Sequence, residues 1–175
     1  MPAKAQGYSF IMRDGTVLPA HELARGIYLL MQHEPKLIFD RIWKLIEAEI
    51  PTDRRPQFEA DFLEKMRLFS EAAALRVLIT TKNNDKRYEP LLWEFEDYLF
   101  PSGPTDEGQK KLEALKSAMG DIQTLSISPE LTWARDWFLQ LGHDETNPAT
   151  LVAFTQMFAD GTRGLRKLLN EAIPR

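Results

Sequence analysis

The sequence contains no cysteine among its 175 residues. Disulfide bonds, thiolate nucleophiles and zinc sites built on thiolates are therefore excluded. A chain without such cross-links must be held together by its hydrophobic core, and this one is long enough to bury a core. Hydrophobic residues are 43% and charged residues 27%, the balance of a globular domain rather than a disordered one. The absence of cysteine also fits a reducing compartment, so we expect a cytoplasmic protein.

Glycine is scarce as well, with nine residues. The chain accordingly lacks the glycine-rich phosphate loop, the dinucleotide fingerprint and the Gly-x-Ser-x-Gly nucleophile turn. Its three histidines, His21, His33 and His143, form no His-x-x-x-His or Glu-x-x-His pair. Residues 143–145 place three metal-ligand types in one loop, but adjacent side chains seldom converge on one ion. We therefore predict no catalytic residue, no metal site and no cofactor, and the sequence leans against an enzyme.

Long hydrophobic runs are absent too. No apolar stretch reaches the roughly 18–20 residues that a membrane helix needs. Residues 1–7 hold one basic residue and no apolar segment, so we expect no signal peptide. The net charge of −4 opposes general binding of nucleic acid, and a helix-turn-helix at 19–50 would have too apolar a recognition helix for DNA. We predict neither a membrane nor a direct nucleic-acid partner.

Apolar residues at helical spacing predict an all-α fold of about eight helices in one compact bundle. In the segment 36–50 they cover more than half the helix circumference, which predicts a central, largely buried helix. Asp160-Gly161 is expected to turn the chain between two short helices. The expected helices cover residues 19–34, 36–50, 53–79, 90–100, 105–119, 128–141, 147–158 and 164–172.

The segment 8–17 carries the clearest β signal. Asp14-Gly15 favours a tight type I′ turn between two extended arms, although an irregular arm over 1–18 is the alternative. Residues 1–175 are expected to form a single helical domain. The loop Pro-Ser-Gly-Pro at 101–104 could divide it into two halves, but its shortness favours one packed unit.

Charge and aromatic residues are unevenly distributed. Residues 1–87 carry 14 basic and 12 acidic groups, net +2, whereas residues 88–175 carry 8 basic and 14 acidic groups, net −6. An aromatic side chain surrounded by acids suits an interface for a basic partner protein. The alternative is an ordinary core tryptophan beside a solvated acidic face. The predicted interface consists of Trp93, Glu94, Glu96, Asp97 and Tyr98.

These observations favour a non-enzymatic protein-interaction domain, acting as an adaptor, regulator or inhibitor. A second hypothesis is a small-molecule- or metal-binding protein or enzyme with a pocket between helices, its polar groups drawn from the histidines and nearby acids. Acid pairs such as Asp61 with Glu64 could serve it, but a solvated helix face explains them equally. A third hypothesis is a homodimeric structural protein, with Trp133 and Trp137 on one helix face as the dimer surface.

Overall fold

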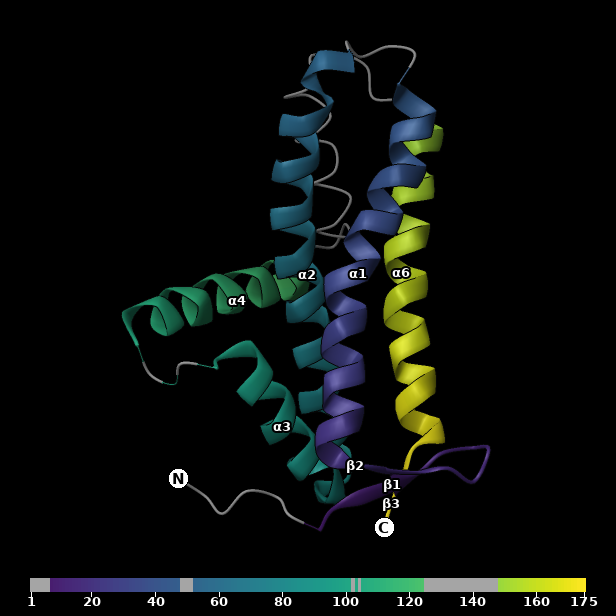
Figure 1. Ribbon diagram of the computed structural model, residues 1–175, viewed down its shortest axis with the longest axis vertical. Helices are drawn as coiled ribbons and strands as arrows, with labels where there is room; N and C mark the ends of the chain where they lie inside the picture. Colours follow the sequence, from purple (N-terminus) through teal and green to yellow (C-terminus); the bar gives the residue numbers. More distant parts are fainter. Residues whose placement is uncertain (1–6, 48–51, 102, 104, 125–147) are drawn as a thin grey trace.

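The computed structural model describes residues 7–47, 52–101, 103, 105–124 and 148–175. These residues are mainly helical, and a small sheet closes one end of the helical layer (Figure 1). The α-helices are α1 (Ala20–Ile46), α2 (Arg55–Asn84), α3 (Glu89–Leu99), α4 (Asp106–Thr124) and α6 (Pro148–Glu171). The 3₁₀-helices are η1 (Thr52–Arg54) and η2 (Lys86–Tyr88), and the strands are β1 (Ser9–Ile11), β2 (Val17–Pro19) and β3 (Ile173–Pro174).

The prediction of about eight helices is wrong, because the described residues form five α-helices. Two expected breaks do not occur: Pro35 lies inside α1, and Gly161 lies inside α6. A proline removes one helical hydrogen bond, but buried residues on both sides of it, Met31 and Ile38, hold α1 continuous through their packing. Gly161 has a different role, described below. The expected helix 128–141 lies outside the described residues.

The fold is not all-α, because the two ends of the chain build a three-stranded antiparallel sheet in the order β2-β1-β3. In the N-terminal hairpin, Ser9 pairs with Pro19 and Ile11 with Val17. On the other side of β1, Phe10 pairs with Pro174. A strand as short as β3 has no pattern of its own, so its pairing with β1 could not be predicted from the sequence.

The hairpin turn differs from the expected type I′. Gly15 N donates to Met12 O at 2.9 Å, so the central residues of the turn are Arg13 and Asp14. Among the residues of this turn, Gly15 alone has a positive φ, of 84°, whereas a type I′ turn requires positive φ at both central residues. The arrangement is a three-residue loop with glycine in the left-handed bulge position. Asp14 Oδ1 reinforces it by accepting from Thr16 N at 2.9 Å.

The central helix is α2, and the prediction that residues 36–50 occupy the centre is wrong. Helix α2 packs against each of the other four described α-helices, and its residues 69–78 are buried on nearly every side. In the second half of α1, by contrast, Leu37 and Leu45 are 61% and 54% exposed. Alanines at 72–74 allow close approach of neighbouring helices to α2, a feature that a count of large apolar residues does not register.

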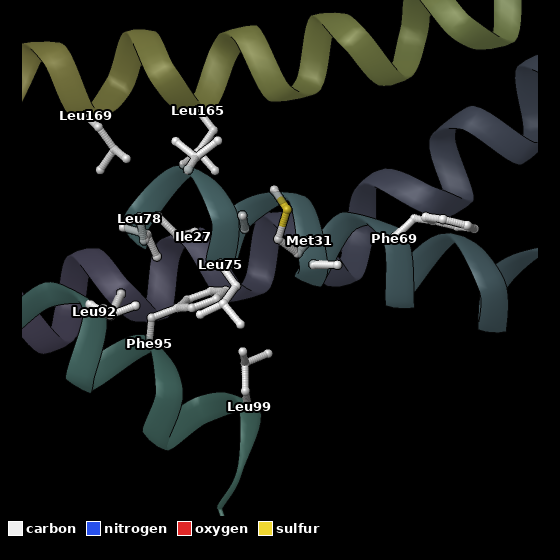
Figure 2. Close-up of a cluster of buried hydrophobic side chains, with 14 of the residues drawn as sticks. Ile27, Met31, Phe69, Leu75, Leu78, Leu92, Phe95, Leu99, Leu165 and Leu169 are labelled. Carbon is white, nitrogen blue, oxygen red and sulfur yellow. The ribbon is translucent and has the colours of Figure 1, made fainter. Parts of the chain in front are cut away.

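Figure 2 shows how the core is assembled around α2. Leu165 and Leu169 reach down from α6, and Phe95 and Leu99 point in from α3 on the opposite side, with Leu78 of α2 between them. The inner face of α3 consists of apolar residues at helical spacing, Leu91, Leu92, Phe95 and Leu99, all of which are buried. Burial of this face determines which residues of α3 point outward.

Tyr88 connects the end of α6 to the rest of the fold. Its buried hydroxyl lies 2.7 Å from Ala172 O and 3.1 Å from Leu169 O, so it donates to carbonyl groups at the C-terminal end of α6. Its ring lies 5.6 Å from that of Phe10 in β1. One side chain thus joins η2, α6 and the sheet.

Candidate functional site

Helix α3 presents a narrow outward face. Pro90 lies in the first turn of α3, where its missing backbone N–H costs nothing. The apolar residues on the inner side of the helix are buried. Trp93 and Asp97 lie one helical turn apart and are both exposed. Trp93 keeps 39% of its surface in solvent, which is high for a residue that usually buries most of its area.

The two predicted glutamates lie at the edges of this face, and both are half-buried. Burial raises the pKa of the Glu96 carboxyl, the charge of Asp97 raises it further, and Lys82 of α2 lowers it. A carboxylate in this position is incompletely solvated, so a cation placed against it would stabilise its charged form.

Tyr98 does not share the outward face. Its ring stacks on that of Tyr28 in α1, with centroids 5.7 Å apart and an interplanar angle of 20°. It packs against the core as part of the contact between α1 and α3. The structure therefore brings together Trp93, Glu94, Glu96 and Asp97, which we call the α3 face, and separates Tyr98 from them.

The other residues proposed from the sequence do not converge. His21 and His33 are exposed on α1, and Asp61 and Glu64 are exposed on α2. In the part of the chain that the structure describes, no three histidine, aspartate or glutamate side chains come close enough to hold a metal ion. Trp133, Trp137 and His143 lie outside the described residues.

A buried ion pair that the sequence did not indicate joins three helices. Glu71 of α2 is only 5% exposed. Its Oε1 accepts from Gln32 Nε2 of α1 at 2.8 Å, and its Oε2 lies 3.1 Å from Lys111 Nζ of α4. Both carboxylate oxygens thus have partners, and the pair attaches α4, which crosses α2 in Figure 1.

Between α1, α2 and α6 lies a small hollow of about 10 Å³, room for about one water molecule, which opens to solvent. Two polar groups face it. Ser70 is 2% exposed, and its Oγ has no hydrogen-bond partner. Glu34 is half-buried, and burial alone raises the pKa of its carboxyl. The hollow is lined by Met31, Glu34, Ser70, Ala73, Ala74, Gly161, Thr162 and Leu165.

Sequence reasoning missed this hollow for identifiable reasons. Ser70 precedes an alanine-rich run and resembles a neutral helix residue, and Gly161 suggested a turn. A Cβ added at Gly161 would overlap Glu34 Oε1 and lie 2.7 Å from Glu34 Cδ. Gly161 therefore makes room for a carboxylate from α1, and only the packing of α6 on α1 reveals that.

Replacing Glu34 by glutamine should stabilise the protein in a pH-dependent way. Burial raises the pKa of the Glu34 carboxyl in the folded state above its ordinary 4.5. The stability tied to the protonated carboxyl is therefore lost as the pH rises through this folded-state pKa and the carboxyl ionises. The variant should match the parent near pH 4.5 and exceed it at pH 7 by up to about 1 kcal/mol, a small figure because solvent screens a half-exposed group. Urea unfolding at both pH values measures this.

The exposed Glu64 provides a matched control for that measurement. Glu64→Gln removes the same charge from the surface of α2, and its effect should stay within about 0.5 kcal/mol at both pH values. A Glu34→Gln variant that is less stable than the parent at pH 7 would show that the carboxylate has a stabilising partner.

Comparison with known proteins adds no relative. No protein-family model, no curated protein and no solved structure matches the chain. Among the described helices, none combines the length and the apolar character needed to cross a membrane.

Proposed function

We propose that this protein is a non-enzymatic interaction domain, and that the α3 face binds a partner protein through a basic surface. The observation that carries the proposal is the exposure of Trp93 at the centre of that face, with Asp97 one turn away. Tryptophan is enriched among residues that dominate binding energy, and surrounding acids favour a cationic partner. The roles of adaptor, regulator and inhibitor all follow from such binding.

The electrostatics of the α3 face support the same proposal. From residue 88 to residue 108 the sequence contains six glutamates and aspartates and no lysine or arginine to balance their charge. The half-buried Glu96, whose pKa is raised by burial and by Asp97, would regain stabilisation from a partner's cation. A cytoplasmic location belongs to the proposal and depends on the absence of cysteine.

Affinity capture with the purified chain, followed by identification of the bound protein, tests the proposal. The triple variant Trp93→Ala, Glu94→Lys, Asp97→Lys should weaken binding of the purified partner by about 100-fold or more, because it removes an aromatic anchor and reverses two charges. Isothermal titration calorimetry measures the affinity, and circular dichroism should show unchanged helix content.

A matched triple variant controls for general surface effects. Leu37→Ala, Asp61→Lys, Glu64→Lys alters one exposed apolar residue and two exposed acids with the same change of net charge. Its affinity for the partner should equal that of the parent. Equal affinity of the α3 triple variant would exclude the α3 face as the binding site.

A further inference from the structure

The second half of α1 has an outward side that combines apolar and basic residues. Leu37, Arg41 and Leu45 follow one another four residues apart, so they lie on one side of the helix, and Lys44 is exposed beside them. Leu37 and Leu45 are 61% and 54% exposed. No ion pair formed among the described residues involves Arg41 or Lys44. We call Leu37, Arg41, Lys44 and Leu45 the α1 face.

The α1 face complements the α3 face in charge and in size. The α3 face presents an exposed tryptophan with three acids, whereas the α1 face presents two leucines with two cations. From Leu37 to Leu45 the helix extends about 12 Å, and the 11 residues of α3 extend about 16 Å. A tryptophan ring packs well on leucine side chains, and an arginine over that ring adds a cation–π contact.

These two faces can meet only between molecules. Within one chain α3 packs on α1 through its inner residues and through Tyr98, whose ring stacks on Tyr28, so the α3 face is turned away from α1. Contact between two α1 faces would bring cations together, and contact between two α3 faces would bring acids together. The α1 face of one copy against the α3 face of another is the combination that pairs opposite charges.

We infer that the α1 face of one copy of this protein binds the α3 face of a second copy. The inference rests on the proposed function and deepens it, because it names the basic surface that the α3 face binds. Each contact joins two different surfaces, so a bound pair keeps one free α1 face and one free α3 face, and larger assemblies form at high concentration. The dissociation constant is expected to be on the order of tens of micromolar, because two helix faces bury less area than a standard interface.

Sedimentation equilibrium of the full chain from about 5 to about 500 μM, a range that brackets this dissociation constant, tests the inference. The weight-average mass should rise from that of one copy toward that of two or more. The association should weaken at least about threefold in about 0.5 M sodium chloride, because salt screens the charges that the two faces pair.

Charge reversal identifies the two faces. Arg41→Glu with Lys44→Glu should weaken association about tenfold or more, because it places acids opposite acids. Glu94→Lys with Asp97→Lys should have the same effect, because it places cations opposite cations. A chain with all four changes has the net charge of the parent and again presents opposite charges, so its association should return to within about threefold of the parent. A variant that merely failed to fold would not regain association in this way.

Two further variants control for net charge alone. Lys65→Glu with Arg67→Glu reverses two exposed cations of α2, and Asp61→Lys with Glu64→Lys reverses two exposed acids of the same helix. Both variants should associate as the parent does.

A monomer at every concentration would overturn the inference. The proposed function would still stand if affinity capture retrieved another protein that the α3 triple variant fails to bind. Association that both reversals leave unchanged, or that the chain with all four changes does not regain, would overturn the inference as well. So would a monomer that binds vesicles of phosphatidylcholine and phosphatidylserine and loses this binding on reversal of the α1 face, because the α1 face would then bind a membrane surface.

Discussion

Replacing Leu78 by alanine should lower the free energy of unfolding by about 3–5 kcal/mol. Leu78 is 0% exposed and lies in the part of α2 that the other helices surround (Figure 2). Its truncation removes buried methyl groups and leaves a cavity that the surrounding helices cannot close without moving. A loss of this size is a large share of the stability of an ordinary domain, so the variant should unfold at much lower urea concentration.

Leu37→Ala is the matched control, because it makes the same chemical change at a residue that is 61% exposed. Its effect should lie within about 0.5 kcal/mol. The two variants also distinguish two arrangements of the bundle. If the segment 36–50 formed the centre, as its apolar composition predicted, Leu37→Ala would cost as much as Leu78→Ala, and that result would contradict the central position of α2.

The second large effect is expected for Lys111→Met, which leaves the buried carboxylate of Glu71 without its cation. Breaking a fully buried ion pair costs about 3–5 kcal/mol, and the Lys111 side chain is 32% exposed, so we expect about 2–3 kcal/mol. The loss should appear as a lower urea midpoint with an unchanged slope. Because this ion pair joins α2 to α4, hydrogen exchange should accelerate first in α4.

Two further variants check the cause of that loss. Adding Glu71→Gln to Lys111→Met should restore much of the stability, because a neutral amide can keep the bond from Gln32 without a buried charge. Lys116→Met breaks an exposed pair with Glu113 on the same helix and should be nearly neutral. A Lys111→Met variant as stable as Lys116→Met would mean that the Glu71 carboxylate is adequately solvated without its lysine.

Several local features could be predicted because they depend on neighbours in the chain. The inner stripe of α3 follows from apolar residues at helical spacing, and Pro90 marks its start. The N-terminal hairpin follows from Asp14-Gly15, although its turn type does not, because the left-handed conformation falls on Gly15 alone. The outward position of Trp93 also follows from its angle relative to the inner stripe.

Other features depend on which surfaces meet. Tyr98 faces Tyr28 because α3 packs along α1. Tyr98 is therefore not part of the outward surface that the sequence predicted as an interface. Helices were predicted to end at Pro35 and Gly161 because breakers are judged from local preference, whereas packing against other helices outweighs that preference. The hollow with Ser70 and Glu34 brings together residues from α1, α2 and α6, and no spacing along the chain connects them.

The sequence by itself determined that this protein is mainly helical, that it has no thiol chemistry, and which side of α3 is apolar. These properties depend on composition and on residues a few positions apart. Only the tertiary structure decided that α2 is the central helix, that β3 completes the sheet, and that Glu71 is paired while Glu34 and Ser70 are not. The physical reason is that burial and pairing are properties of contacts between distant segments, and the chain must pack before those contacts exist.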